Sequence, residues 1–367
     1  MVEAVVVIVI LTLMPFVLLR WYFFATHKQS DSLTNLIRAD QCSVIIPFRN
    51  EAQSLPRLLR CLERQVVYPA EIIFVNDHST DDSLSILEEW SKEKNNVTVE
   101  SLPRFLKGKK QGVHRAMQLA SFPYCLTMDA DVWMNNTFFD SLSVNSEVDL
   151  QIRPVLMVSQ SILGKMAAIE YQFFNAFSYW VNPFYTLSAS GANLLVKRET
   201  YFEGGGFDVH QHIASGDDYF LLRNFQKNNA GIAHSIQNQD IVYTPAPKGV
   251  RDYLNQRVRW LRKSRTVFDW RESFLGVLII SYLLGTFVLF VLSLIQSNYG
   301  AGLIIFGIRL VTDALVLIHF RKQFKDYGYW WLIPLMQIIY PLLFLVVLIV
   351  SSFYDPPWKG RRINAKN

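Results

Sequence analysis

Acidic residues at the ends of two apolar segments are the side chains best placed to do chemistry. Asp129 and Asp131 follow one apolar run, and Asp77 closes another. Two carboxylates spaced by one residue can hold a hard divalent cation through oxygen ligands, and such a cation can neutralise a diphosphate leaving group. Asp-x-Asp also occurs often in turns, so its position at a strand end is what favours a metal site.

A second acidic pair, Asp217 and Asp218, follows Gly216 and precedes a helix-like segment. Either side chain could simply cap that helix. A carboxylate here could also act as a general base that deprotonates an acceptor hydroxyl. The residues themselves leave both interpretations open.

Basic residues gather where another helix is expected to begin. Lys107, Lys109 and Lys110 surround Gly108, just before a helical segment at 111–120. Glycine with basic residues at a helix N-terminus suits an anion such as phosphate. A solvated basic loop is the alternative.

The polar stretch after the second strand combines a binding candidate with capping residues. Asp77 could accept hydrogen bonds from a base or a ribose. Asp81, Asp82 and Ser83 precede a helix, where such side chains satisfy free backbone N–H groups. We therefore expect ligand binding from Asp77 and helix capping from the other three.

Gln256, Arg259 and Trp260 lie just before a long apolar segment and share one face if the segment is helical. Arginine can bind phosphate in a bidentate manner, and tryptophan can stack on a sugar or a base. A juxtamembrane anchor is the alternative, because Arg and Trp are enriched at membrane interfaces.

The elements that must position these residues alternate between strands and helices. The spacing predicts strands at 43–47, 71–77, 96–102 and 124–131, and helices at 55–65, 83–94 and 110–120. Nearly all strand positions are apolar, which is typical of a mostly parallel α/β sheet with helices on both faces. Ligands of such sheets bind beyond the carboxyl ends of the strands, where the acids fall.

Apolar segments at both ends of the chain predict membrane insertion. Residues 5–24 could cross the bilayer as an uncleaved anchor, with a signal peptide as the alternative, and 274–295, 302–320 and 331–353 are three further candidates. The positive-inside rule places the intervening domain in the cytoplasm, most simply at a bacterial inner membrane.

The basic C-terminal tail does not fit three simple crossings. A third full crossing would put the basic residues of 358–362 outside, against the charge rule, so one segment is expected to be kinked or re-entrant; 332–349 contains Pro334 and Pro341. Arg309 and Asp313, four residues apart within the middle segment, form an intramembrane pair with either a functional or a packing role.

Composition and charge indicate which class of partner and which cell compartment to expect. The chain has 367 residues and a net charge of +5, with basic residues near the apolar segments, so we expect a membrane partner and no nucleic acid. The three cysteines have no metal-ligand spacing, which favours structural thiols in a reducing compartment.

The order of the motifs is more specific than any one of them. The series is IPFRNE at 46–51, VNDHSTD at 75–81, DAD at 129–131, SGAN at 190–193, GGFD at 205–208, GDD at 216–218 and QRVRW at 256–260. It resembles the membrane-bound family-2 glycosyltransferases with a GT-A fold. The Gln-x-x-Arg-Trp element makes it similar to ceramide glucosyltransferases and to cellulose, chitin and hyaluronan synthases.

The resemblance implies roles for the residues that match the motifs. Pro47 and Glu51 would line the nucleotide pocket and Asp77 would bind the base. Asp129 and Asp131 would contact the donor and a Mn²⁺ or Mg²⁺ ion on its diphosphate. Gln256, Arg259 and Trp260 would close over the diphosphate and the acceptor.

The catalytic base implied by the resemblance is Asp218. The family's Glu-Asp pair is Asp217-Asp218 here, so Asp217 remains a rival. The expected reaction is an inverting single displacement from a nucleotide sugar, such as a UDP-sugar, to a lipid or membrane-associated acceptor. A processive polysaccharide synthase and a non-catalytic membrane scaffold are the alternatives, and three C-terminal apolar segments favour transfer of a single sugar.

The expected organisation therefore has four parts. Residues 1–26 form a transmembrane anchor, 40–265 a cytoplasmic GT-A domain, 272–353 about three membrane helices, and 354–367 a basic tail.

Overall fold

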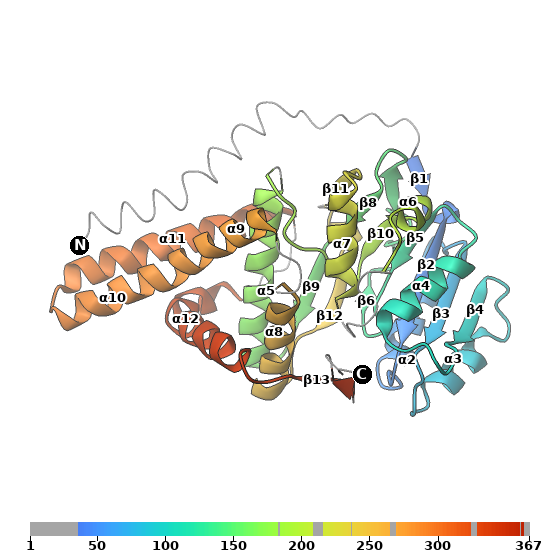
Figure 1. The fold of residues 1–367 in the computed structure, drawn as a ribbon, viewed down its shortest axis with the longest axis horizontal. Coiled ribbons are helices and arrows are strands. Elements are labelled where there is room, and N and C mark those ends of the chain that lie inside the picture. Colours follow the sequence, from blue (N-terminus) through green and yellow to red (C-terminus); the bar gives the residue numbers. More distant parts are fainter. Residues whose placement is uncertain are drawn as a thin grey trace. The chain divides into compact units, whose positions relative to one another are not determined.

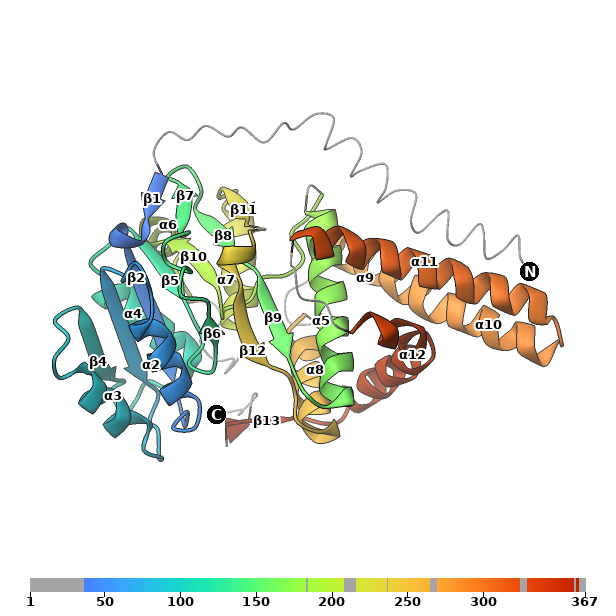
Figure 2. The same cartoon turned by 180° about the vertical axis from the view of Figure 1, so that it is seen from behind.

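The computed structural model describes residues 36–182, 184–207, 216–235, 237–264, 269–323, 329–359 and 361–362. They form two compact units (Figures 1 and 2). The sheet unit comprises the described residues within 32–158, 188–245 and 355–367, and the helical unit those within 159–187 and 246–354. The predicted anchor at 1–26 lies outside the described residues. Residues 159–187 and 246–264, which fall within the predicted range 40–265, pack with the C-terminal helices.

The sheet unit is built on a seven-stranded mixed sheet in the order β11-β8-β10-β5-β2-β3-β4. Strands β2, β3, β4 and β5 run parallel, whereas β10 is antiparallel to both β5 and β8, and β11 is parallel to β8. The strands are β2 (Cys42–Phe48), β3 (Glu71–Asn76), β4 (Val97–Ser101), β5 (Tyr124–Thr127), β8 (Leu150–Ile152), β10 (Leu194–Lys197) and β11 (Ile232–His234).

Helices cover both faces of this sheet, which buries its mostly apolar central strands on both sides. Figure 1 shows α4 (Lys109–Leu119) and α7 (Asp217–Lys227) on one face, and Figure 2 shows α2 (Leu55–Glu63) and α3 (Ser83–Ser91) on the other. Short α6 (Arg198–Glu203) follows β10. Every residue of β2 is buried, and its Cys42 thiol lies in the core with that of Cys125 on β5. The predicted α/β class is therefore confirmed.

Smaller sheets complete this unit. A three-stranded sheet has the order β6-β12-β9, and two-stranded sheets pair β1 with β7 and β13 with β14. Their bounds are β1 (Leu36–Arg38), β6 (Trp133–Met134), β7 (Ser143–Asn145), β9 (Val155–Val158), β12 (Val242–Pro245), β13 (Pro357–Trp358) and β14 (Arg361–Arg362), with 3₁₀ turns at Ala39–Gln41 and Asn238–Asp240.

Strand β5 is shorter than the sequence pattern indicated. It ends at Thr127 rather than at Asp131, because β2 pairs with β5 only as far as Ile45, opposite Thr127. Beyond that point β2 pairs with β3 alone, so the missing N–H of Pro47 costs no ladder hydrogen bond on the β5 side. The acids therefore lie in the turn after the strand.

The helical unit contains α5 (Ile162–Val181), α8 (Val250–Ser264), α9 (Trp270–Ile280), α10 (Thr286–Ile295), α11 (Tyr299–Gln323) and α12 (Ile333–Val350). A π-helical segment, Ser281–Gly285, joins α9 to α10, and a 3₁₀ turn, Trp330–Leu332, precedes α12. Helices α10 and α11 lie side by side as an antiparallel hairpin (Figures 1 and 2).

Three helices of this unit are long and apolar enough to cross a membrane. They are Trp270–Ile295, with a mean hydropathy of 2.6, Tyr299–Leu317, with 1.9, and Ile333–Val350, with 2.6. Large apolar side chains such as Val277, Ile295 and Leu303 are exposed on them, which suits contact with lipid. The three predicted C-terminal apolar helices are confirmed.

Candidate functional site

Two loops at the carboxyl edge of the sheet are tied together by hydrogen bonds. Arg49, after β2, donates through Nη1 to the carbonyl oxygens of Asp77 (2.7 Å) and His78 (2.6 Å), after β3. Asn50 and His78 both have left-handed backbone conformations, with φ of 52° and 54°. Asn50 tolerates this conformation better than most residues. The loops after β2 and β3 thus form one joined rim, residues 49–51 and 77–78, at the ends of the two strands.

Asp77 holds the basic loop in place. It is 1% exposed, and its Oδ1 accepts a hydrogen bond from the backbone N–H of Gly108 at 3.0 Å. Gly108 itself has a φ of 102°, which suits a residue without Cβ. Binding of a nucleotide base by Asp77 stays a prediction. Its hydrogen bond to Gly108 is structural and positions the first residue of α4, Lys109.

Lys109 joins two carboxylates that come from different elements. Its Nζ lies 2.6 Å from Asp129 Oδ1, after β5, and 2.7 Å from Asp217 Oδ2, at the start of α7. Burial disfavours the charged ammonium, but the carboxylates of Asp129, Asp217 and Asp218 outweigh it, so the pKa of Lys109 is raised. The lysine therefore stays charged and fixes the geometry of the acids.

Asp217 and Asp218 differ in their surroundings. Asp217 is buried against Lys109. Burial raises the pKa of Asp217, Lys109 opposes this rise, and Asp218 and Asp129 add to it. Asp218 is half-buried, and its Oδ1 accepts from the N–H of Tyr219 at 2.7 Å. Both acids occupy the first turn of α7, where the helix dipole favours negative charge. Asp218 is thus the more accessible carboxylate.

Gly191 approaches the ion pair closely. A Cβ at this position would lie 2.5 Å from Asp217 Oδ2 and 3.0 Å from Lys109 Nζ. The Thr127 hydroxyl at the end of β5 donates to the Gly191 carbonyl at 3.0 Å and holds this backbone in place. The SGAN motif therefore brings the backbone close to the acids.

The turn after β5 offers oxygen ligands for a cation. Burial raises the pKa of Asp131 to about 7, Asp129 and Glu51 add to the rise, and Lys359 and Lys109 oppose it. The Asp131 carbonyl is held by Arg57 Nη2 at 2.8 Å. A divalent cation would relieve this crowding of carboxylates, so the donor set fits Mn²⁺ or Mg²⁺.

The protein supplies only part of the ligands that such a cation needs, so substrate oxygens would supply the rest. Among the described residues, no group of three or more His, Cys, Asp or Glu side chains could hold a metal ion. Mg²⁺ is commonly bound through one or two carboxylates together with substrate phosphates. Asp129 and Asp131 match that pattern.

Lys359, in the C-terminal tail, is a site residue that sequence reasoning missed. Its ammonium forms an ion pair with Glu51 and donates to the Arg49 carbonyl at 3.0 Å. Only the basic character of the tail could have suggested it. The carboxylate of Glu51, in the loop after β2, is therefore already paired with the Lys359 ammonium.

Pro47 is buried under α4. A Cβ on Gly112 would lie 2.9 Å from the Pro47 Cβ, so the helix packs directly on the proline ring. That Pro47 lines the nucleotide pocket stays a prediction. The nearby capping prediction is confirmed for Asp81, which accepts from the N–H of Ser83 at 3.1 Å, whereas Asp82 makes no capping bond.

The Gln-x-x-Arg-Trp motif lies on α8 of the helical unit. The Trp260 ring packs 5.7 Å from the Tyr171 ring of α5, and Gln256 accepts from Arg257 at 2.6 Å. Arg257, which sequence reasoning passed over, is buried and forms an ion pair with Glu170 of α5 at 2.9 Å. Contact of Gln256, Arg259 and Trp260 with the diphosphate and the acceptor stays a prediction. Asp208 lies outside the described residues.

Comparison with known proteins places this geometry in a family. The model described as "Glycosyl transferase family group 2" matches residues 124–349, and the one described as "Glycosyl transferase family 2" matches residues 43–142. A similar solved structure is the mannosyltransferase PcManGT from Pyrobaculum calidifontis, in complex with GDP-Man and Mn²⁺. It has a TM-score of 0.55 and 14% identity, and the alignment covers 96% of this chain and 99% of that one.

Curated relatives match shorter stretches. An undecaprenyl-phosphate 4-deoxy-4-formamido-L-arabinose transferase of Pseudomonas fluorescens Pf-5 is 36% identical over 24% of this chain and 27% of its own length. A 4,4'-diaponeurosporenoate glycosyltransferase of Staphylococcus haemolyticus is 29% identical over 38% of this chain and 36% of its own length. The match therefore spans well under half of each relative.

The family match covers more than half of the chain, and the sheet unit has the fold that the motif series implied. The predicted resemblance is confirmed: the chain belongs to glycosyl transferase family group 2 and is a glycosyltransferase with a GT-A fold and three C-terminal apolar helices.

Proposed function

We propose that this enzyme moves a sugar from a nucleotide-sugar donor, such as a UDP-sugar, to a lipid or membrane-associated acceptor with inversion at the anomeric carbon. The observation that carries the proposal is the cluster of Asp129, Asp217 and Lys109, which draws three elements of the sheet unit together at its carboxyl edge. The names of the two relatives, which act on undecaprenyl phosphate and diaponeurosporenoate, support a lipid acceptor.

Each residue of the cluster has a proposed task. Asp218 removes the proton from the acceptor hydroxyl, because it is half-buried whereas Asp217 is held by Lys109. Lys109, at the start of α4, faces the donor phosphates, and Asp77 and Glu51 orient the nucleoside. The family resemblance assigns Gln256, Arg259 and Trp260 to binding of the diphosphate and the acceptor.

Asp129 and Asp131 would hold Mn²⁺ or Mg²⁺. The ion supplies charge neutralisation for the diphosphate when bound. The neighbouring carboxylates Asp129 and Glu51, which add to the effect of burial in raising the pKa of Asp131 to about 7, support this assignment because a cation would offset their repulsion. A neighbouring fold with Mn²⁺ agrees with it.

The distribution of basic residues supports a membrane placement of the chain. We propose an integral, multi-pass protein of a bacterial inner membrane, with the sheet unit in the cytoplasm. The basic residues that follow the first apolar run, and those of the loop at 321–325, support this side.

Labelled nucleotide sugars tested on membranes that contain the chain, with Mn²⁺ and lipid extract, are expected to yield a lipid-soluble product with one sugar. A ladder of products would show a processive synthase instead. No lipid-soluble label from any common donor would contradict the proposal.

Replacement of the two adjacent acids separates the base from its rival. Asp218→Asn is expected to lower kcat by about 10²–10⁴ with little change in the unfolding temperature, since it removes a proton acceptor. Asp217→Asn is expected to lower the unfolding temperature because it weakens the pair with Lys109. Full transfer activity of Asp218→Asn would contradict its catalytic role and would leave Asp217 as the candidate base.

A further inference from the structure

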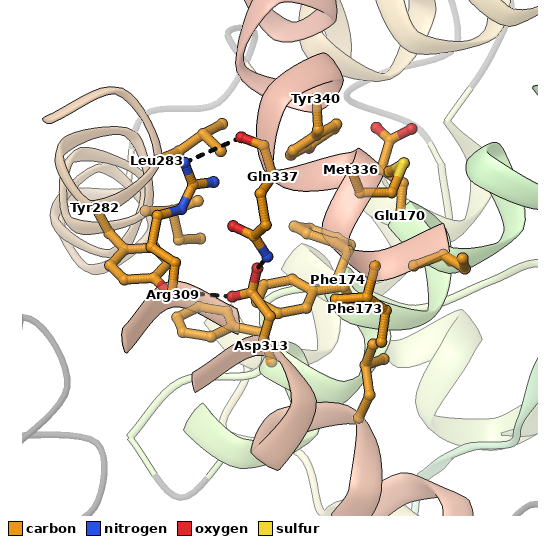
Figure 3. A pocket seen from close by; sticks show the side chains of 15 residues that line it. Glu170, Phe173, Phe174, Tyr282, Leu283, Arg309, Asp313, Met336, Gln337 and Tyr340 are labelled. Atoms are coloured by element: carbon orange, nitrogen blue, oxygen red, sulfur yellow. Dashed lines mark hydrogen bonds between the residues drawn. The ribbon is translucent and has the colours of Figure 1, made fainter. Parts of the chain in front are cut away.

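A pocket within the helical unit is not accounted for by sugar transfer at the sheet edge. It lies between α5, the π-helical segment, α11 and α12 (Figure 3). Its walls are mostly apolar and include Phe173, Phe177, Ile279, Leu283 and Met336. Its volume of about 90 Å³ suits the polar end of a lipid rather than its chains.

A polar network crosses one wall of this pocket. Asp313 accepts hydrogen bonds from the Tyr282 hydroxyl at 3.2 Å and from Gln337 Nε2 at 2.5 Å. Arg309 Nη1 donates to the main-chain carbonyl of Gln337 at 3.2 Å. Figure 3 shows these side chains converging from the π segment, α11 and α12. The Arg309–Asp313 pair noted in the sequence is therefore part of a larger network that faces a cavity.

Two atoms of this network are buried without a partner. Arg309 Nε and Gln337 Oε1 have no hydrogen-bond partner among the described residues, and these residues are only 4% and 3% exposed. An unsatisfied buried polar atom is costly, and more so within a membrane. One is a donor and the other an acceptor, which is the pair that a hydroxyl group satisfies.

The charges around the pocket are already balanced. Asp313 lies one helical turn from Arg309 on α11. Glu170, on α5, is paired with Arg257 at 2.9 Å and accepts from the Tyr253 hydroxyl at 2.9 Å. A phosphate or carboxylate in the pocket would face two carboxylates with no surplus cation, so a neutral head group is favoured.

We propose that this pocket binds the hydroxyl end of a neutral lipid, whose chains extend along the apolar helices. The hydroxyl accepts from Arg309 Nε and donates to Gln337 Oε1. The π-helical segment supports a binding role, since such segments occur often at functional sites and this one contributes Tyr282 and Leu283. That the bound lipid is also the sugar acceptor rests on the proposed function; the binding itself does not.

The unaltered full chain in lipid nanodiscs tests this directly, without any sugar donor. A photoactivatable dioleoylglycerol is expected to label peptides of α5, the π segment or α12, and excess unlabelled dioleoylglycerol to reduce the label at least fivefold. Its O-acetyl ester and dioleoyl phosphatidic acid are expected to compete at least fivefold less well. Equal competition by the ester, better competition by phosphatidic acid, or no label on these peptides would overturn the proposal.

Matched variants test the position of the site. Ile279→Trp fills the pocket, whereas Ile295→Trp makes the same change on the exposed surface of α10. We expect labelling to fall at least fivefold in the first and to be unchanged in the second. Equal labelling of both would place the lipid elsewhere. If Ile279→Trp fails to fold, the competition series on the unaltered chain still decides.

Failure of this inference and failure of the proposed function are distinguishable. Labelling that is competed as expected, together with no sugar transfer to lipids, would leave the pocket assigned and refute the acceptor. Transfer to lipid without labelling of the pocket would refute the pocket alone.

Discussion

At the scale of single residues, the site depends on one cation between buried acids. Lys109 is mostly buried and contacts carboxylates from two elements. Removing one partner of a buried pair leaves an uncompensated charge, which costs more than the pair itself contributes. Lys109 therefore has a structural role as well as the proposed role toward phosphate.

Lys109→Met is expected to destabilise the sheet unit by about 3 kcal/mol, since it leaves Asp217 buried without its counter-ion. Chemical denaturation of the purified chain measures this. The matched control is Lys107→Met, because Lys107 lies two residues before Lys109 in the chain and its side chain is exposed. The double variant Lys109→Met with Asp217→Asn should recover part of the lost stability without recovering activity. Equal stability of the two single variants would contradict the role given to Lys109.

A second prediction at the scale of single residues is that sugar transfer depends on a divalent metal. Chelation with EDTA is expected to abolish sugar transfer, and added Mn²⁺ or Mg²⁺ to restore it. Asp131→Asn should raise the metal concentration needed for half-maximal activity by about tenfold or more, because an oxygen ligand loses its charge. Metal titrations of initial rate provide the measurement, with Asp82→Asn as an exposed control. Full activity in EDTA would rule out the metal.

At the scale of elements, the site forms where loops from separate strands meet. The joined rim after β2 and β3, the turn after β5 and the start of α7 each contribute, and Gly191 permits the closest approach. The strand periodicity predicted where the acids would lie. It did not predict that β5 would end before them, because that depends on which neighbours pair with β2.

Gly191→Ala is expected to destabilise the chain by about 1–3 kcal/mol and to lower transfer activity, since its Cβ would displace the Lys109–Asp217 pair. Gly249→Ala is the control, because a Cβ there meets nothing within 4 Å. Thermal unfolding and initial rates of both variants test this. If Gly191→Ala matches Gly249→Ala in both measurements, the close approach is unimportant.

At the scale of the whole molecule, a contact of the C-terminal tail with the sheet unit limits the membrane topology that we expect. Lys359 follows α12 in the chain and is bonded to Glu51 and Arg49 of the sheet unit. It must therefore lie on the same side of the membrane as that unit. An odd number of crossings after residue 264 is incompatible with this contact.

Helix α12 is the helix that we expect not to cross. Pro341 lies within it. Near its start α12 joins an apolar cluster through Ile333 and Met336, and near its end it joins another through Val347. The first cluster includes a residue of α11 and the second includes residues of α8, so the two ends of α12 pack on different helices of the unit.

Labelling of single cysteines in sealed vesicles tests this topology. In a Cys61→Ala background, Ser85→Cys in the sheet unit and Ser352→Cys after α12 are expected to react with an impermeant maleimide from the same side. Ser297→Cys, between α10 and α11, should react only from the other side. All three positions are exposed. Reaction of Ser352→Cys together with Ser297→Cys would mean that α12 crosses fully.

The sequence alone determined the α/β class, the strand-end position of Asp77, Asp129 and Asp131, the three apolar helices and the family. It could do so because hydrophobic periodicity and motif order are local properties of the chain. Only the tertiary structure brought Lys109 between Asp129 and Asp217, Lys359 beside Glu51, and Arg309 and Gln337 into one pocket wall. These contacts join residues far apart in the chain, and their partners follow from strand order and helix packing, which no local pattern specifies.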